Sequence, residues 1–286
     1  MLQPVLDKRW SERRERASEL AERWSFAAEV LGFYRALLDV QERAFDAALA
    51  DRPARDRIAA YVVERTLPSV IDTSVASGPP AMTESVLSTF HEAELEPMVD
   101  AWLRGENLSA VERYLARASA GPVLEALSPS FERSFASDDN LCPQCGGVPQ
   151  LSYFAPSDED LVTSHRHLVC SRCAWAWKFP RLMCASCGET ENKALTIFGE
   201  IGTTQAELSE NIIKARGGGS ASKLPPAQFP HMRIDGCKTC SKFLLSLDLE
   251  RDRRSVPVVD EIAAIPLSLY AVEHGLSKIV PNLMGF

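Results

Sequence analysis

The 286-residue sequence lacks the features that mark a membrane or secreted protein. No apolar run approaches ~18 residues, the length that indicates a membrane-spanning helix, so we expect no membrane insertion. No apolar signal segment opens the sequence, which argues against secretion and therefore against stable disulfides. With 45% hydrophobic and 24% charged residues, the composition is that of a soluble globular protein long enough for two domains.

The sequence also lacks a positive charge balance and any recognisable catalytic motif. It has 31 Lys and Arg against 39 Asp and Glu, and residues 1–140 carry the whole excess, with 16 basic against 24 acidic side chains. Because nucleic-acid binders usually present a net basic face, we expect no nucleic-acid partner. No nucleotide-binding loop or nucleophile–base constellation is present, so we expect no enzyme activity.

Cysteine is absent from the first 141 residues and from the last 46, and this distribution makes residues 142–240 distinctive. All eight cysteines form four Cys-x-x-Cys pairs: Cys142/Cys145, Cys170/Cys173, Cys184/Cys187 and Cys237/Cys240. A Cys-x-x-Cys turn directs two sulfurs at one point, and two such turns complete a tetrahedral four-sulfur shell. Four pairs with none left over predict two metal ions in four-cysteine sites, Fe or Zn. The five histidines are not needed as ligands, but His167 and His231 precede closing turns, so among the histidines we expect these two to touch a site or a partner.

The cysteine region can be divided into two copies of one layout. Each copy has an opening Cys-x-x-Cys-Gly turn, an apolar strand, an excursion, a returning strand and a closing turn followed by another strand. The four pairs allow three ways of coupling, and this layout favours Cys142, Cys145, Cys170 and Cys173 as one site. The second site is then Cys184, Cys187, Cys237 and Cys240. Gly146 and Gly188 follow the opening turns, where a positive φ is often needed.

The remaining sequence predicts helices on both sides of this region. Apolar residues recur at helical spacing over residues 7–51, 58–67, 83–102 and 109–118, with a further helix opening at Gly121-Pro122. Residues 68–82 are rich in Pro, Gly, Ser and Thr and predict a loop, and Thr83 resembles the N-cap of the next helix. Asp260 is a plausible N-cap for a C-terminal helix over 261–274 that Pro266 should kink or split, followed by an apolar tail packed on the ribbons.

The predicted fold is therefore α+β, with an N-terminal all-helical domain at 1–140. Two tandem rubredoxin-like or zinc-ribbon β units follow at 141–250, and a C-terminal helix with its tail at 251–286. Within the second excursion we expect a short helix at 206–215 and a mobile glycine-rich loop at 216–220. Trp175, Trp177 and Phe179 would share one face of a strand, either packed in a core or exposed as a recognition face.

These motifs resemble one known family, the FdhE-type formate dehydrogenase accessory proteins. The resemblance lies in Cys142-Pro-Gln-Cys-Gly, His167-Leu-Val-Cys-Ser-Arg-Cys, Met183-Cys-Ala-Ser-Cys-Gly and Met232-Arg-Ile-Asp-Gly-Cys-Lys-Thr-Cys. Pro257-Val-Val-Asp-Glu-Ile and Pro281-Asn-Leu-Met-Gly-Phe extend it to the end of the sequence. It is specific from about residue 140 onward and general in the helical part. The long excursion between Cys187 and Cys237 and the presence of Pro266 depart from the family pattern.

The resemblance implies a cytoplasmic, chaperone-like assembly factor. Members bind the catalytic subunit of a respiratory formate dehydrogenase before the enzyme is exported, and they have two rubredoxin-like sites with iron as the described metal. By position, the eight cysteines would be the ligands, and a homodimer is possible. Two alternatives stay open: a rubredoxin-like redox or electron-transfer protein, and a ribbon that binds nucleic acid through Lys178, Arg181, Lys238 and Lys242.

Overall fold

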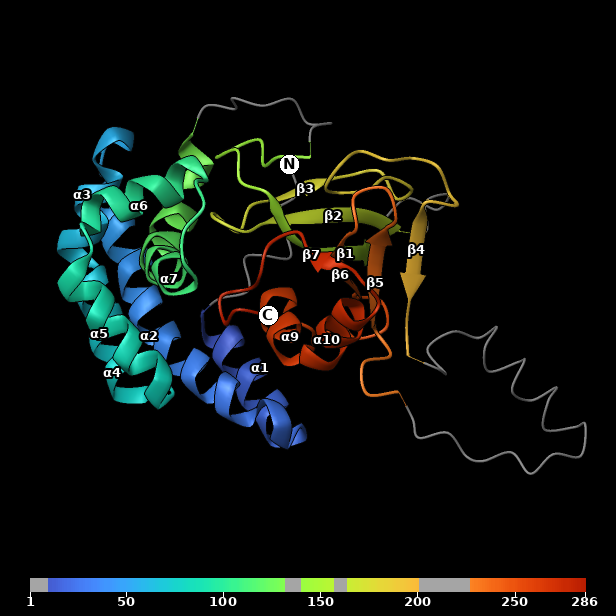
Figure 1. Cartoon of the computed structure of the whole chain (residues 1–286), viewed down its shortest axis with the longest axis horizontal. Coiled ribbons are helices and arrows are strands. Elements are labelled where there is room, and N and C mark those ends of the chain that lie inside the picture. Colours follow the sequence, from blue (N-terminus) through green and yellow to red (C-terminus); the bar gives the residue numbers. More distant parts are fainter. Residues whose placement is uncertain (1–9, 132–139, 157–163, 201–226) are drawn as a thin grey trace, which may run out of the picture.

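The N-terminal part of the chain is a bundle of helices (Figure 1). The computed structural model describes residues 10–131, 140–156, 164–200 and 227–286. The helices are α1 (Trp10–Arg23), α2 (Ala28–Asp51), α3 (Ile58–Arg65), α4 (Leu67–Ser77), α5 (Pro80–Glu92), α6 (Leu95–Arg104) and α7 (Ala110–Leu127). Short 3-10 turns lie at Ser25–Ala27, Arg55–Arg57 and Ser128–Ser130. The prediction of an N-terminal helical region is confirmed.

The loop predicted for residues 68–82 is wrong, because most of this segment forms α4 and the start of α5. Its prolines occupy the first turns of these helices, where a missing N–H costs no hydrogen bond. Thr83 is correspondingly inside α5, and its backbone N–H bonds to the Pro79 carbonyl (3.0 Å). Leu67, Val70 and Ile71 are buried in the bundle, so packing outweighs the loop-like composition.

The predicted helix boundary at Gly121-Pro122 is also wrong, since α7 runs through both residues. A proline inside a helix leaves the carbonyl four residues earlier without its N–H partner. Here that carbonyl belongs to Ala118, and the Gln41 side chain of α2 donates to it (3.1 Å). At its start, α7 has a full capping box between Ser109 and Glu112.

The cysteine-rich part forms one twisted sheet in the order β3-β2-β1-β6-β5-β4, with β7 beside β6. The strands are β1 (Pro149–Pro156), β2 (Ser164–Cys170), β3 (Ala176–Lys178), β4 (Leu195–Phe198), β5 (Met232–Cys237), β6 (Lys242–Asp248) and β7 (Ser277–Lys278). Each predicted ribbon supplies three antiparallel strands. The two ribbons join where β1 and β6 pair in parallel, with Leu151 opposite Leu245. The two units therefore share a continuous sheet.

The C-terminal helix is split at Pro266, as predicted, into α9 (Pro257–Ala263) and α10 (Ile265–Glu273). The predicted N-cap role of Asp260 is wrong, because α9 starts at Pro257 and its N-cap residue is Val256. Asp260 instead accepts a hydrogen bond from the Val256 backbone N–H with its carboxylate (2.8 Å), from inside the first turn. Gly275 follows α10 with a φ of +79°.

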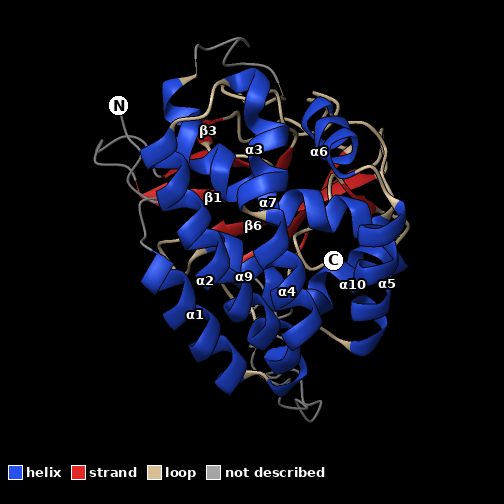
Figure 2. Ribbon diagram, turned by 90° about the vertical axis from the view of Figure 1, so that its left-hand side faces the viewer, coloured by secondary structure: helices blue, strands red, loops and turns tan. Residues whose placement is uncertain are grey.

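Two hydrophobic clusters connect the helical part with the sheet. Because side chains alternate across a strand, Leu168 and Leu244 point into a cluster with α2–α7. Their neighbours Val169 and Leu245 point into a second cluster with α1, α2 and α9. Seen from the helical side, α2 and α7 lie in front of the strands (Figure 2). The domain boundaries at 140 and 250 stay a prediction.

The fold class is confirmed, as a helical region followed by a sheet that carries two four-cysteine clusters and ends in helices. The helix expected at 206–215 and the loop at 216–220 lie outside the described residues. Among the described helices, none is both long and apolar enough to cross a membrane.

Candidate metal centres

The two opening turns have the same backbone geometry. The Cys142 N–H bonds to the Gly147 carbonyl and the Cys184 N–H to the Glu189 carbonyl, both at 2.8 Å. As predicted, the glycine after each second cysteine has a positive φ, +71° at Gly146 and +75° at Gly188. In both copies the turn therefore places its two sulfurs on the same side.

The closing turns use the same left-handed backbone without glycine. Ala174 follows Cys173 with a φ of +54°, and Ser241 follows Cys240 with a φ of +53°. Such a conformation costs a side-chain-bearing residue about 1–2 kcal/mol. Sequence inspection missed these positions because alanine and serine do not signal a positive φ.

The grouping predicted for the cysteines is confirmed by the geometry. Cys142, Cys145, Cys170 and Cys173 form one cluster, called site 1, in which the Cys142–Cys173 and Cys145–Cys170 sulfurs lie 3.6 and 3.4 Å apart. Cys184, Cys187, Cys237 and Cys240 form the other, called site 2, in which the Cys184–Cys240 and Cys187–Cys237 sulfurs lie 3.8 Å apart. The remaining couplings that the spacing allowed are not formed.

The sulfur–sulfur distances at site 2 match those around a tetrahedral metal ion, and those at site 1 are slightly shorter. Metal–sulfur bonds of ~2.3 Å in a tetrahedron place neighbouring sulfurs about 3.8 Å apart. A disulfide would need ~2.05 Å, so none of the four measured pairs is one. Burial raises the pKa of the Cys170 thiol and raises that of Cys184 to about 12, so these two thiols disfavour the thiolate form without a cation, whereas hydrogen bonds from neighbouring thiols lower the pKa of Cys145. A bound divalent ion would reverse this, and both clusters could hold one.

The two sites differ in their access to solvent. At site 1, Cys142, Cys170 and Cys173 are at most 2% exposed and belong to the cluster shared with α2–α7. At site 2, Cys187 is exposed and Cys240 half-buried, and no site 2 cysteine belongs to either hydrophobic cluster. Site 1 is therefore part of the core that joins helices to sheet, whereas site 2 lies near the surface.

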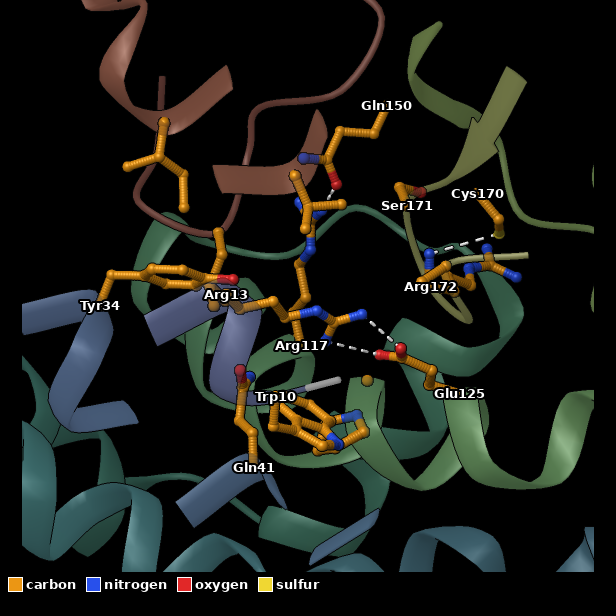
Figure 3. Close-up of a pocket in the computed structure, with 16 residues that line it drawn as sticks. Trp10, Arg13, Tyr34, Gln41, Arg117, Glu125, Gln150, Cys170, Ser171 and Arg172 are labelled. Carbon is orange, nitrogen blue, oxygen red and sulfur yellow. Dashed lines mark hydrogen bonds and ion pairs between the residues drawn. The ribbon is translucent and has the colours of Figure 1, made fainter. Parts of the chain in front are cut away.

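Arginines connect site 1 to the helical bundle, around a small cavity of about 80 Å³ (Figure 3). The Arg172 N–H points at the Cys170 sulfur (3.4 Å), while its guanidinium donates to the Leu103 carbonyl of α6 (3.0 Å). Across the same cavity, Arg13 of α1 forms a bidentate pair with Glu125 of α7. Arg117 of α7 donates to Gln150 on β1. Arg117 of α7 thus supplies positive charge beside a cage that would be negative when it holds a divalent ion, whereas Arg13 is neutralised by Glu125.

Arg166 on β2 connects the two ribbons beside site 2. Its side chain is 3% exposed and pairs with Asp235 on β5 (3.2 Å). It also donates to the carbonyl of Met183, the residue before Cys184 (2.9 Å). Asp235 lies two residues before Cys237. One guanidinium therefore binds the chain just before each of the two turns that form site 2. This role was missed at the sequence level, because nothing in the pattern distinguishes Arg166 from a surface charge.

We expect Arg166→Gln to weaken metal retention at site 2 by about tenfold, the lower end of the range for lost outer-shell partners. The reason is that both site 2 turns lose a common anchor. Chelator-driven metal release, followed with a colorimetric indicator, checks the result. Arg233→Gln is the matched control, because Arg233 also pairs with Asp235 (2.8 Å) but has no hydrogen bond to the Met183 carbonyl. Equal release rates in both variants and the wild type would contradict the anchoring role.

The histidines do not belong to the cysteine clusters. His167 stacks on Tyr153 with ring centroids 5.0 Å apart, and burial lowers its pKa. His231 is buried with its Nε2 atom 3.4 Å from an Asp260 oxygen. His231, Asp252 and Asp260 could form a third metal group, but the Arg16 guanidinium already bonds both carboxylates. Neither histidine therefore touches a four-cysteine site.

The aromatic strand is mainly core. Trp177 and Phe179 are buried in the cluster with the helices, and Trp175 is half-buried beside it.

The basic residues proposed to bind nucleic acid are spread over the sheet. Lys178 is on β3 and Lys242 on β6, with β2 and β1 between these strands. These positions favour packing for the aromatic residues and give no continuous basic strip.

The fold and these clusters define a class of protein, a helical bundle joined to a double ribbon with two four-cysteine sites. No family model matches the chain. A curated FdhE homolog of Aquifex aeolicus is 26% identical over 215 residues, covering 73% of this chain and 65% of that protein. An FdhE homolog of Pseudomonas aeruginosa is 26% identical over 144 residues, covering 50% of this chain and 39% of that protein. The matched regions thus span less than two thirds of these relatives.

A solved structure extends the likeness to the whole fold. The crystal structure of the FdhE protein from Pseudomonas aeruginosa has a TM-score of 0.63 and 23% sequence identity, and the match covers 99% of this chain and 97% of that one. This structure shows that the chain has the same fold, and the curated relatives show that half to three quarters of the chain is similar to FdhE homologs.

Proposed function

We propose that this protein is a non-catalytic accessory factor for a respiratory formate dehydrogenase. In this proposal it binds the catalytic subunit in the cytoplasm and is needed for assembly or activity of that subunit before export. The main support is the pair of four-cysteine clusters within a fold shared with FdhE proteins. The boundaries at 140 and 250 and a homodimeric state belong to the same proposal.

The eight clustered cysteines are the proposed ligands of about two metal ions, Fe or Zn. The ions would crosslink the ribbons, because each four-cysteine cluster joins two turns that are more than 20 residues apart in sequence. A charged four-sulfur cage at site 1 would also attract the arginines that face it. The chemistry of the donors does not choose between the two metals, since thiolates bind both.

A pull-down tests the proposal. The tagged protein is isolated from cells that produce a respiratory formate dehydrogenase, and the bound proteins and metals are measured on one sample. We expect the catalytic subunit to co-purify together with about two ions per chain. Cells that lack the catalytic subunit provide the control. Recovery of fully metallated protein without the catalytic subunit would contradict client binding and leave the metal proposal intact.

Electron transfer is a second candidate, favoured by the exposure of Cys187 at site 2. An iron ion held there would lie near solvent, where a redox partner could approach. This candidate predicts a reversible one-electron couple in iron-loaded protein that disappears in Cys187→Ala. Absence of any reversible couple in iron-loaded wild-type protein would exclude it.

A further inference from the structure

A large apolar groove lies between the helical bundle and the last residues of the chain. Its volume is about 650 Å³, within the range of about 300–1,000 Å³ typical of ligand sites. Apolar side chains of the 3-10 turn Ser25–Ala27, of α2, α5 and α7, and of the C-terminal segment line it: Phe26, Val30, Met82, Val111, Leu283 and Phe286. In Figure 1 the C-terminal segment returns to the side of α9 that faces α2 and α7. We call this cavity the tail groove.

The tail groove has an excess of positive charge on its α7 wall. Arg113 and Arg117 lie one helical turn apart and both line it. Arg113 donates to the Leu108 carbonyl (3.2 Å), and Arg117 to the Pro281 carbonyl and Gln150. Within the described residues, neither guanidinium has a carboxylate oxygen within 4.0 Å. Burial lowers the pKa of Arg117 to about 10 although Glu261 is near, as expected for a cation that lacks a direct counter-charge.

An unused hydrogen-bond donor lines the same groove. Asn282 is 4% exposed, and its Oδ1 atom accepts bonds from the backbone N–H groups of Met284 (2.9 Å) and Phe286 (3.1 Å). These bonds fix the amide orientation. The Nδ2 atom is buried and has no partner among the described residues. Buried donors are nearly always satisfied in native proteins, so this one indicates a missing acceptor.

The rim of the groove indicates the size of its occupant. Phe26 and Phe286 are 46% and 37% exposed. A small molecule inside the groove would leave these rings in water, whereas a polypeptide segment that continues past the groove would cover them. Glu29 also lines the groove, but it is exposed and would not oppose a carboxylate held at the buried Asn282 side.

We propose that the tail groove binds an apolar peptide segment that carries one carboxylate, supplied by the client catalytic subunit. The apolar walls would bury the segment, while Arg113, Arg117 and the Asn282 Nδ2 atom would bind the carboxylate. The inference rests on the proposed accessory function and names the surface through which that function works.

The test compares three variants in the pull-down described above. Phe26→Asp and Arg113→Glu place negative charge at the groove, and Val272→Asp places it on an exposed apolar residue of α10 (58% exposed) outside the groove. We expect client capture to fall at least tenfold in the two groove variants and to stay unchanged in Val272→Asp. Metal content and melting temperature, measured on each variant, show that the fold is retained. Full capture of the client by the folded groove variants would overturn the proposal that the groove binds the client, and would leave the accessory function intact. No capture by the wild type would overturn the accessory function itself.

A fluorescent probe tests the groove without the client. Anilinonaphthalene sulfonate combines apolar rings with one anionic group, so we expect it to bind wild-type protein and to lose affinity in Phe26→Asp and Arg113→Glu. Unchanged probe affinity in both variants would contradict the proposal that the tail groove binds an apolar group with a negative charge. Decanoate serves as a competitor: displacement of the probe without any loss of client capture would assign the groove to a fatty acid and overturn the peptide proposal.

Discussion

Cys142→Ala is expected to release about one metal ion per chain and to destabilise the protein far more than Cys237→Ala, which should release one ion as well. The two residues are equally buried, at 0% and 1% exposure, so the difference comes from their sites. Cys142 belongs to the hydrophobic cluster that includes α2–α7, and Cys237 belongs to neither cluster. Binding of a structural zinc ion is worth about 10–16 kcal/mol in small zinc domains, a free energy comparable with a typical protein stability of about 5–15 kcal/mol, so losing site 1 should remove much of the stability of the helical part.

Metal analysis by mass spectrometry and thermal melting followed at 222 nm check this expectation. In Cys237→Ala, the helical signal should melt near the wild-type temperature, because α2–α7 retain site 1 beneath them. In Cys142→Ala, the helical transition itself should broaden and move down by more than about 10 °C. Ser171→Ala is the control, since it changes a non-ligand residue between Cys170 and Cys173. Two bound ions in the Cys142→Ala, Cys237→Ala double variant would refute the assignment of ligands.

Prediction from sequence succeeded where one local rule governs the structure. The cysteine grouping follows from the repeated layout, and the positive φ values at Gly146 and Gly188 follow from the turn type. The apolar spacing of residues 10–51 likewise marks α1 and α2. For the turns and the helices a few neighbouring residues contain the information, and for the cysteine grouping the repeated order of turns and strands contains it.

Prediction from sequence failed where a residue distant in the sequence compensates for a local signal. Pro122 predicts a helix break, but Gln41, 77 residues before Ala118, satisfies the carbonyl that the proline leaves free. The parallel pairing of β1 with β6 joins strands about 90 residues apart, and no turn between them encodes its register. Arg166 and Asn282 look like ordinary polar residues until the fold surrounds them. Such roles depend on tertiary contacts, so the candidate metal sites could be predicted but the groups around them could not.

Asp260→Ala is expected to destabilise the protein by about 3–5 kcal/mol, the range for removing one partner of a buried ion pair. The Arg16 and Asp260 side chains are 2% and 1% exposed, and the Arg16 Nε atom lies 3.0 Å from an Asp260 oxygen. The variant would leave a buried guanidinium with only Asp252 and Glu19 as counter-charges. It would also remove the acceptor of the Val256 N–H at the start of α9. Urea unfolding with the free energy extrapolated to water measures the loss.

Two comparisons separate this ion pair from a general effect of losing charge. Arg14→Ala breaks exposed pairs with Asp39 and Glu42 on α2 and should cost no more than about 1 kcal/mol. The double variant Arg16→Met, Asp260→Leu should recover part of the loss, because no buried guanidinium is left without its main partner, although the Val256 N–H still lacks its acceptor. A single variant within 1 kcal/mol of the wild type would show that α1 and α9 are held by apolar packing alone. Since this pair joins residues 244 positions apart, its loss would also loosen α1 from α9.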